Sequence, residues 1–238
     1  QHKFGVKQRS DFAKKGGINC DVLLMSATPI PRTMMMSHYG DMDVSKITEK
    51  PSARKKINTL SKPEKKINEL WNFLTKQIAE KNQIFWVCPL IEESKFLDFS
   101  SAKKKFDLIN NKFPNKVGLI HGSLGKEEKE KVLKKFLEKK ISILVSTTVI
   151  EVGIDFPNAN VIIIENANKF GLAQLHQLRG RVGRGNRQAT CILLFKESLS
   201  KNSIKRIKIL KSSDDGFFIA EEDLKLRGFG DLTGYQQS

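Results

Sequence analysis

Two arginines three residues apart, Arg181 and Arg184, are the side chains of this sequence best suited to chemistry on a phosphate. They follow Gln177 in the segment QLRGRVGR, residues 177–184. If the segment is helical, side chains at i and i+3 share one face, so both guanidiniums can reach one target. A guanidinium is permanently charged and its planar fork matches phosphate oxygens, so the pair could stabilise a phosphoryl group in transfer. The alternatives are a solvated turn or a phosphate contact on nucleic acid alone.

Hydroxyl side chains come directly after two apolar runs. Ser26 and Thr28 follow one run, and Thr147 and Thr148 follow another. At the end of a strand, a short hydroxyl and a free backbone N–H can bond a phosphate of a nucleic acid strand. Ser26 and Thr28 could also cap a helix that begins near Pro29. The two readings of the first pair are compatible.

These motifs resemble those of superfamily 2 helicases, in the same order along the chain. Residues 170–184, FGLAQLHQLRGRVGR, contain the sixth motif and closely resemble the RecG branch-migrating DNA helicases and their relative, the transcription-repair coupling factor. Residues 25–33 (MSATPIPRT) are similar to the third motif, and residues 146–155 (STTVIEVGID) to the fifth. The stretch WVCPLIEES at 86–94 is closer to RecG than to the coupling factor. With a C-terminal segment, the matches span the chain almost from end to end.

The resemblance implies that five residues act at a nucleotide. Arg181 and Arg184 would act in trans on ATP held by another lobe. Gln177 belongs to the same motif and would contact the nucleotide. Gly153 allows a close backbone approach, and Asp155 can accept a hydrogen bond from a ribose hydroxyl.

The resemblance also implies contacts to DNA. His121 and Gly122 follow an apolar run and resemble the phosphate-contacting position of the second motor lobe. Thr147 and Thr148 would bond the backbone of the tracking strand. A lone histidine is more often an ordinary hydrogen-bonded residue, so the role of His121 stays open at this point.

The C-terminal segment at 226–234, LRGFGDLTG, resembles the "translocation in RecG" motif that both families share. This motif and the third helicase motif imply a role in coupling the nucleotide site to movement. At Gln236 the RecG pattern more often has arginine, which leaves the DNA contacts of the loop open. The alternative is a glycine-rich tail. The residues assigned to coupling are Ser26, Thr28, Arg206, Arg227 and Gln237.

The composition favours a polyanionic partner. The chain has 238 residues, with 42 Lys and Arg against 26 Asp and Glu, a formal net charge of +16. Such an excess attracts polyanions, of which nucleic acid is the most common. Many lysines fall on the solvated faces of predicted helices, so charge by itself supports nucleic acid binding only modestly.

The three cysteines, Cys20, Cys88 and Cys191, are far apart and show no metal-binding spacing. An odd count without a disulfide framework suits a reducing cytoplasm, and we expect no metal site. Cys88, Cys191 and Trp86 lie in apolar runs and are expected in the core. No apolar segment is long enough to cross a bilayer, and no signal peptide opens the chain.

Continuous apolar runs alternate with amphipathic stretches along most of the sequence. Runs of this kind indicate strands buried on both faces, and their alternation with helices is typical of βαβ units. The fold class is therefore α/β, and the resemblance implies a RecA-like parallel sheet with flanking helices, followed by a C-terminal helical hairpin and loop. The predicted strands are 22–25, 84–88, 117–120, 141–145, 161–164 and 191–195. The predicted helices are 64–80, 96–111, 126–138, 172–179, 203–210 and 217–226.

The pattern and the resemblance together divide the chain into three parts. Residues 1–50 are expected to be the C-terminal remnant of a first RecA-like lobe, because the residues from Gln1 onwards resemble those directly after the Asp-Glu of the second helicase motif. Residues 51–200 form the second RecA-like lobe, and residues 201–238 form the helical hairpin and translocation motif. Ligands of parallel sheets bind at the carboxyl ends of the strands, where we expect the motifs to lie.

No phosphate-binding loop of the form GxxxxGK[ST] occurs, and Gly125-Lys126-Glu127 lacks both the leading spacing and the hydroxyl. We therefore expect this piece alone to be inactive, whereas the resemblance implies that the longer parent is an ATP hydrolase that uses ATP and Mg²⁺. The parent would migrate branched junctions and reverse stalled forks, with a wedge domain and first lobe upstream. Its partner would be branched or forked double-stranded DNA. The alternatives are the transcription-repair coupling factor and, in isolation, a non-catalytic nucleic-acid-binding module.

Overall fold

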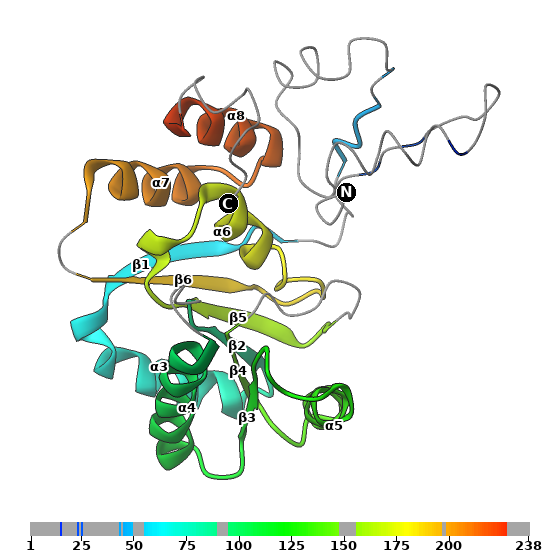
Figure 1. Cartoon of the computed structure of the whole chain (residues 1–238), viewed down its shortest axis with the longest axis vertical. Helices are drawn as coiled ribbons and strands as arrows, with labels where there is room; N and C mark the ends of the chain where they lie inside the picture. The colour runs from blue at the N-terminus through cyan, green and yellow to red at the C-terminus, as the bar shows by residue number, and fades with distance from the viewer. Residues whose placement is uncertain are drawn as a thin grey trace.

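The computed structural model describes residues 55–89, 95–147, 156–196 and 199–227, with Lys15, Leu23, Met25, Asp43 and residues 45–49. Its described part contains a six-stranded sheet in the order β1-β6-β5-β2-β4-β3, in which every pairing is parallel. This confirms the predicted α/β class with a parallel sheet (Figure 1). The strands are β1 (Asn58–Pro63), β2 (Gln83–Val87), β3 (Val117–Ile120), β4 (Ile143–Ser146), β5 (Ala159–Ile164) and β6 (Thr190–Phe195).

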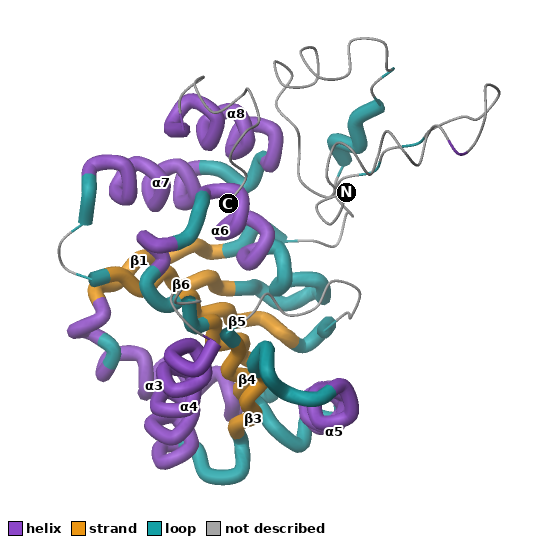
Figure 2. The backbone as a smooth tube through the Cα atoms, viewed as in Figure 1, coloured by secondary structure: helices purple, strands orange, loops and turns teal. Residues whose placement is uncertain are grey.

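Helices cover both faces of the sheet. Helices α3 and α4 pack on one face, while α5, α6 and α7 pack on the other, with α8 against α6 and α7 (Figures 1 and 2). The helices are α3 (Asn68–Ala79), α4 (Lys95–Lys112), α5 (Lys126–Leu137), α6 (Leu172–Arg179), α7 (Lys201–Ser212) and α8 (Gly216–Arg227), with short 3₁₀ turns η1 (Glu64–Lys66) and η2 (Ala167–Lys169).

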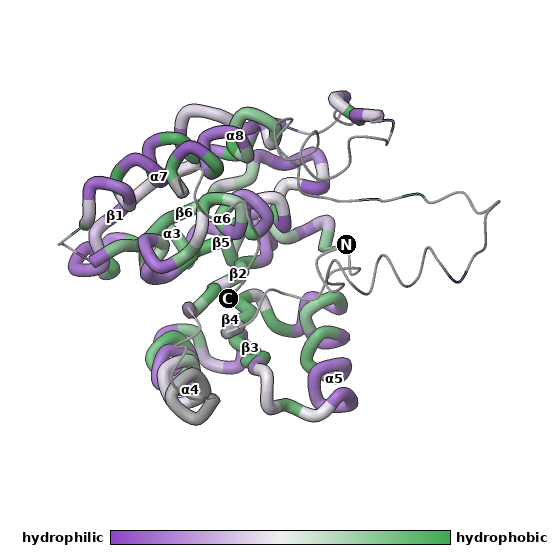
Figure 3. The backbone as a smooth tube through the Cα atoms, turned by 45° about the horizontal axis from the view of Figure 1, so that its top comes forward, coloured by the Kyte–Doolittle hydropathy of each residue, from purple (hydrophilic) through white to green (hydrophobic). Residues whose placement is uncertain are grey.

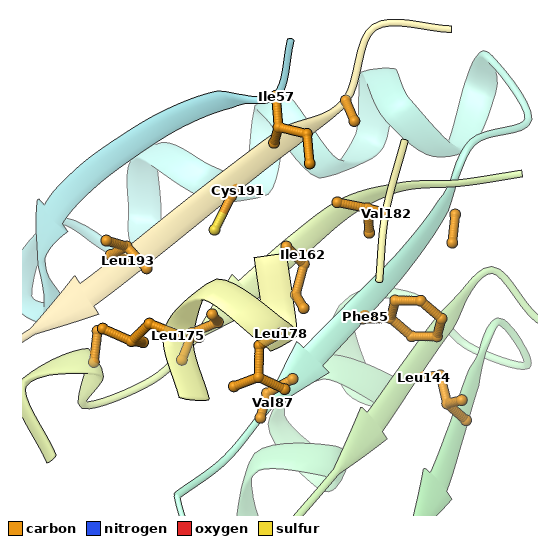
Figure 4. Close-up of a cluster of buried hydrophobic side chains, with 14 of the residues drawn as sticks. Ile57, Phe85, Val87, Leu144, Ile162, Leu175, Leu178, Val182, Cys191 and Leu193 are labelled. Carbon is orange, nitrogen blue, oxygen red and sulfur yellow. The ribbon is translucent and has the colours of Figure 1, made fainter. Parts of the chain in front are cut away.

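The two faces of the sheet explain why the apolar runs are continuous. In β2, Phe85 and Val87 belong to the core on the α6 side, whereas Ile84 and Trp86 belong to the core on the α3 side. Figure 4 shows Phe85 and Val87 directed toward Leu178 of α6, among the side chains of the first core. Successive residues of a strand point to opposite faces, so a strand covered on both sides needs apolar residues at every position.

The strand β1 was not predicted, and its omission has a physical cause. Its sequence, NTLSKP, is mostly polar and ends in Pro63, which carries no N–H for a ladder. In the described sheet β1 pairs only with β6, so it is an edge strand, where polar residues and proline are tolerated. The strand was therefore missed because its polar sequence lacks the apolar run that marks a strand with neighbours on both sides.

The predicted strand at 22–25 is wrong as far as it is described. Leu23 and Met25 have no regular secondary structure and are 80% and 75% exposed. A buried strand needs neighbours on both sides. None of the six described strands pairs with this segment.

The C-terminal hairpin was predicted correctly, within two residues at the ends of each helix. Helix α7 is capped at its start by Ser200, whose hydroxyl accepts a hydrogen bond from the backbone N–H of Ser203 at 3.2 Å. Ile207 of α7 and Ile219 of α8 are buried in the core on the α6 side of the sheet. The hairpin therefore packs into the apolar core of the sheet instead of standing apart from it.

Cys88, Cys191 and Trp86 are buried, as the sequence predicted. Burial raises the pKa of the Cys191 thiol to about 12, with the charge of Arg179 acting in the opposite direction. Burial and the neighbouring carboxylate of Glu165 raise the pKa of Cys88 still further. Both thiols therefore stay protonated at neutral pH, and the thiolate is the reactive form.

We expect Cys88 and Cys191 to react with a thiol reagent at pH 8 only when the chain unfolds. The measurement is labelling of a Cys20→Ser variant, which leaves these two thiols, in native buffer and in denaturant. Protection should weaken as pH rises from the unfolded thiol pKa of about 8.5 toward the folded value, because ionisation then favours the unfolded chain. Rapid native labelling of one thiol per chain would contradict the burial.

Candidate functional site

His121, Gly122 and Thr147 meet at the carboxyl edge of the sheet. Strands β3 and β4 are paired so that Ile120 lies beside Ser146, which makes His121 and Thr147 the next residues on neighbouring strands. The backbone N–H of Thr147 donates to the carbonyl of Ile120 at 3.3 Å, and Thr147 is only 4% exposed. The structure thus brings together three of the four residues predicted to contact DNA.

His121 is half-buried at this edge, and burial lowers the pKa of its imidazole. Glu128 raises the pKa and Lys129 lowers it, by smaller amounts than burial. His121 is therefore neutral at pH 7 and could meet a phosphate through a hydrogen bond rather than a charge. Gly122 is exposed, and a Cβ there would meet no heavy atom within 4 Å. Packing does not require a glycine at this position, which leaves space for a ligand backbone.

Basic residues lie close to the same edge. Helix α5 begins at Lys126, four residues after Gly122, and Lys129 in its first turns is close enough to act on His121. The backbone N–H of Gly125 donates to Glu128 at 3.3 Å, which fixes the start of this helix. Figure 3 colours much of α5 as hydrophilic, in contrast to the neighbouring strands β3 and β4. The edge therefore combines hydrogen-bond donors with a helix N-terminus, where Lys126 and Lys129 stand beside Glu127 and Glu128.

Arg181 and Arg184 lie on the opposite side of the sheet from His121, at the amino ends of the strands. Helix α6 starts beyond the carboxyl end of β5 and runs back along the sheet. After it ends, the N–H of Gly183 donates at 3.2 Å to the carbonyl of Ala159, the first residue of β5. The prediction that all motifs fall at the carboxyl edge is therefore wrong for the arginines. Six strand residues separate the edges, about 15–20 Å.

The expectation that one helical turn aligns the two arginines is also wrong. Helix α6 ends at Arg179, with Gly180 as its C-cap, so Arg181 and Arg184 lie in the turn that follows. Their charges nevertheless interact: burial lowers the pKa of Arg181, and the charge of Arg184 lowers it further. Within the described residues no carboxylate forms an ion pair with Arg181. Two interacting cations of this kind fit an anion with more than one negative oxygen.

Glycines in this turn are required by its backbone and by close approach. Gly183 has φ +72°, and a Cβ there would lie 2.9 Å from the Cβ of Ala189. A Cβ on Gly185 would lie 2.8 Å from the carbonyl oxygen of Pro157. The turn is thus pressed against the segments that lead into β5 and β6, which fixes where the arginines can stand.

We expect Gly183→Ala to lower the free energy of unfolding by about 1–3 kcal/mol, because the change adds backbone strain and a steric clash. Gly122→Ala is the matched control, since its Cβ would enter open space, and should change stability by less than about 0.5 kcal/mol. Urea unfolding of both variants gives the comparison. Equal stability of the two would mean that the turn at Gly183 is not fixed as described.

Of the remaining predicted site residues, only some lie within the part of the chain that the structure describes. Gln177 is half-buried on the last turn of α6, two residues before the helix ends. Arg227 is the last residue of α8, but its side chain lies outside the described residues. The other positions outside the described residues are Ser26, Thr28, Thr148, Gly153, Asp155 and Gln237.

Arg206 is the predicted coupling residue whose contact is described. Its guanidinium donates at 2.9 Å to the carbonyl of Phe170, which immediately precedes the N-cap of α6, Gly171. Arg206 therefore joins α7 of the hairpin to the start of the helix that leads to Arg181 and Arg184.

Arg179 is a site residue that the sequence reasoning missed. It is 2% exposed and lies at the last position of α6. Its guanidinium donates to the carbonyls of Leu210 and of Ser213, the latter at 2.9 Å, and forms an ion pair with Asp214 at 3.1 Å. The available signal was an arginine at an inward position of an otherwise apolar helix face, but its partners lie more than 30 residues away in sequence.

Other kinds of site find no support in the described segments. No cluster of three or more His, Cys, Asp or Glu side chains there could hold a metal ion. Among the same residues, no helix has both the length and the hydrophobicity that a membrane span requires.

Comparisons with known proteins agree with the motifs. The family defined as the helicase conserved C-terminal domain matches residues 65–186. The whole chain is 48% identical to the ATP-dependent DNA helicase RecG of Thermotoga maritima and 45% identical to that of Bacillus subtilis, of which it covers 30% and 35%. It therefore spans about a third of the length of the curated relatives it matches.

A solved structure of RecG bound to a three-way DNA junction is similar to this chain in fold and in sequence. The TM-score is 0.74 and the identity 43%, over 90% of this chain and 29% of that chain. The RecA-like form of the sheet and the resemblance to RecG are thereby confirmed.

Proposed function

The chain belongs to the helicase conserved C-terminal domain family, and from this we propose that it is the C-terminal motor portion of a RecG-type, ATP-dependent double-stranded DNA translocase. The observation that carries the proposal is the pair Arg181 and Arg184, whose charges interact in a fixed turn where Arg181 has no described carboxylate partner. Arg181 therefore offers a half-buried positive charge beside that of Arg184. An anion supplied from outside the described residues would neutralise it.

We place ATP and Mg²⁺ mainly on a first lobe, with this chain completing the site. ATP bound with Mg²⁺ supplies a transferable phosphoryl group and a metal that neutralises part of its charge. Arg181 and Arg184 would neutralise the remainder as charge develops on that group. Gly153 and Asp155, which lie outside the described residues, would contact the nucleotide with Gln177.

DNA would lie along the carboxyl edge, at His121, Gly122, Thr147 and Thr148. Supporting features are the two adjacent strand ends, the open space at Gly122 and Lys129, whose charge acts on His121. The relative in the solved structure is bound to a three-way junction, and we extend branched DNA as the substrate to the whole protein of which this chain is a part. That protein would work in the cytoplasm, migrating junctions and reversing stalled forks.

The three-part division of the chain at about residues 50 and 200 belongs to the same proposal. Ser26 and Thr28 in the first part, and Arg206, Arg227 and Gln237 in the third, would couple hydrolysis to movement of the duplex. The transcription-repair coupling factor, which shares these motor motifs, is the alternative within the class. The whole-chain identity of 48% to a RecG favours the RecG reading.

The proposal predicts how this chain binds DNA. We expect weak binding with little sequence preference, because the predicted contacts are to phosphates. Affinity should fall as salt rises. The slope of log affinity against log salt concentration should be negative, with a magnitude of roughly the number of phosphate contacts. Fluorescence anisotropy with a labelled three-way junction and a matched duplex, from low to high salt, measures this.

A matched pair of variants sharpens the binding test. Lys129→Ala removes a charge next to His121, whereas Lys66→Ala removes one that pairs with Glu69 near the start of α3. The first should weaken binding and lower the salt slope by about one, and the second should do neither. Salt-independent affinity, or equal effects of the two changes, would argue against the carboxyl edge as the DNA site.

A further inference from the structure

Helix α6 is held at both ends by guanidinium groups that connect it with the hairpin. At its start, Arg206 of α7 reaches the carbonyl of Phe170 at 2.9 Å. At its end, Arg179 of α6 reaches the carbonyls of Leu210 and Ser213. The helix is eight residues long, about 12 Å. Contacts at both ends restrict tilting as well as sliding of α6 against α7.

The guanidinium of Arg179 donates hydrogen bonds to backbone carbonyls at the C-terminal end of α7, which have no partner within that helix. Leu210 lies in the last turn of α7 and Ser213 is its C-cap, so their carbonyls have no partner within the helix. One planar guanidinium serves both carbonyls and also faces the carboxylate of Asp214. His176, one turn earlier on α6, accepts from the same guanidinium through Nδ1 at 3.1 Å, since an arginine can only donate. Arg179 therefore fastens α6 to the turn between α7 and α8.

Arg179 lies directly before the turn that carries Arg181 and Arg184, so the same contacts link this turn to the hairpin. Two residues after Arg179 comes Arg181, and the N–H of Arg181 is bonded to the carbonyl of Leu178 at 3.0 Å, so the turn continues rigidly from the helix. Helix α8 also contacts α6 directly. A displacement of the arginine turn is thus passed to the hairpin through buried, hydrogen-bonded contacts.

We propose that Arg179 is a positioning residue that joins the arginine turn at 181–184 and the α7–α8 hairpin into one rigid unit. The inference rests on the proposed function. It assigns to a third arginine of the segment a role that involves neither nucleotide nor DNA. When Arg181 and Arg184 move to engage the phosphate, the hairpin moves with them. Losing Arg179 should therefore separate hydrolysis from DNA movement, rather than reduce hydrolysis itself.

The test compares base pairs unwound per ATP hydrolysed in the whole protein that contains this chain. Arg179→Met should lower this ratio by about tenfold, while the rate of ATP hydrolysis stays within about threefold of the parent. Arg179→Lys keeps a charge facing Asp214 but cannot bridge both carbonyls. Its ratio should therefore lie between those of the unaltered protein and of Arg179→Met. Asp214→Asn, which keeps the carbonyl contacts, should have a smaller effect in the same direction.

Arg187→Met is the matched control. Arg187 also donates to a backbone carbonyl and a side-chain amide, those of Glu80 and Asn82 at 2.8 and 2.9 Å, but its partners lie away from the hairpin. This change should lower stability without changing the ratio. An unchanged ratio in the Arg179 variants, or a proportional fall of both activities, would overturn the proposal.

Three further outcomes are decisive. If Arg179→Met fails to fold, Arg179→Lys and Asp214→Asn take its place. A lowered number of base pairs unwound per ATP in these variants supports the proposal, and an unchanged number overturns it. If the unaltered whole protein shows no DNA-stimulated ATP hydrolysis, the proposed function fails, and this inference fails with it. If that activity is present and only the ratio is unmoved, the proposed function stands and the role of Arg179 is rejected.

Discussion

Replacing Arg184 with alanine in the whole protein is expected to lower DNA-stimulated ATP hydrolysis by about 10³-fold or more, and Arg181→Ala should act similarly. Both arginines belong to a turn whose backbone packs closely at Gly183 and Gly185, and alanine supplies no charge to replace the lost guanidinium. Burial and, to a smaller extent, the charge of Arg184 lower the pKa of Arg181, and a bound anion would offset both effects.

The measurement is phosphate release with saturating branched DNA, together with DNA affinity by anisotropy. DNA affinity should stay close to that of the parent, because the arginine turn and the carboxyl edge are at opposite ends of the strands. Arg187→Ala is the control, since this arginine lies in the same loop but binds Glu80 and Asn82. If Arg184→Ala weakened DNA binding as strongly as hydrolysis, the arginines would be DNA contacts instead.

The second large effect is the inactivity of this chain alone. We expect ATP hydrolysis at least about 10³-fold below that of the whole protein, with or without junction DNA, because the arginines act only on a nucleotide that another lobe holds. The 238 residues contain no GxxxxGK[ST] segment to cradle its phosphates.

Phosphate release by the purified chain decides this prediction, and the chain with both Arg181 and Arg184 replaced by alanine serves as the control. Any background from a contaminating ATPase would be the same in both preparations. Turnover that approached the rate of the whole protein and disappeared in the double variant would mean that this chain holds a complete catalytic site.

The sequence alone determined the class of the fold and the order of its elements. Five of the six described strands and the described helices α3 to α8 could be placed from apolar runs and amphipathic periodicity, because both are set by which neighbours cover each face. The helicase motifs were also readable, since each is a continuous segment whose residue types carry its chemistry. Strand β1 was missed because it is polar, as a strand at the edge of the described sheet can be.

Only the tertiary structure decided where the chemistry lies. His121 and Thr147 are 26 positions apart in the sequence, yet the parallel pairing of β3 with β4 places them side by side. Arg181 and Arg184 are instead carried to the other edge, because α6 runs back along the sheet before it ends. Arg179 belongs to the same short motif, but its partners Leu210, Ser213 and Asp214 follow a further strand and helix. Local periodicity specifies each element, whereas crossover connections and buried hydrogen bonds between distant segments specify which residues can act together.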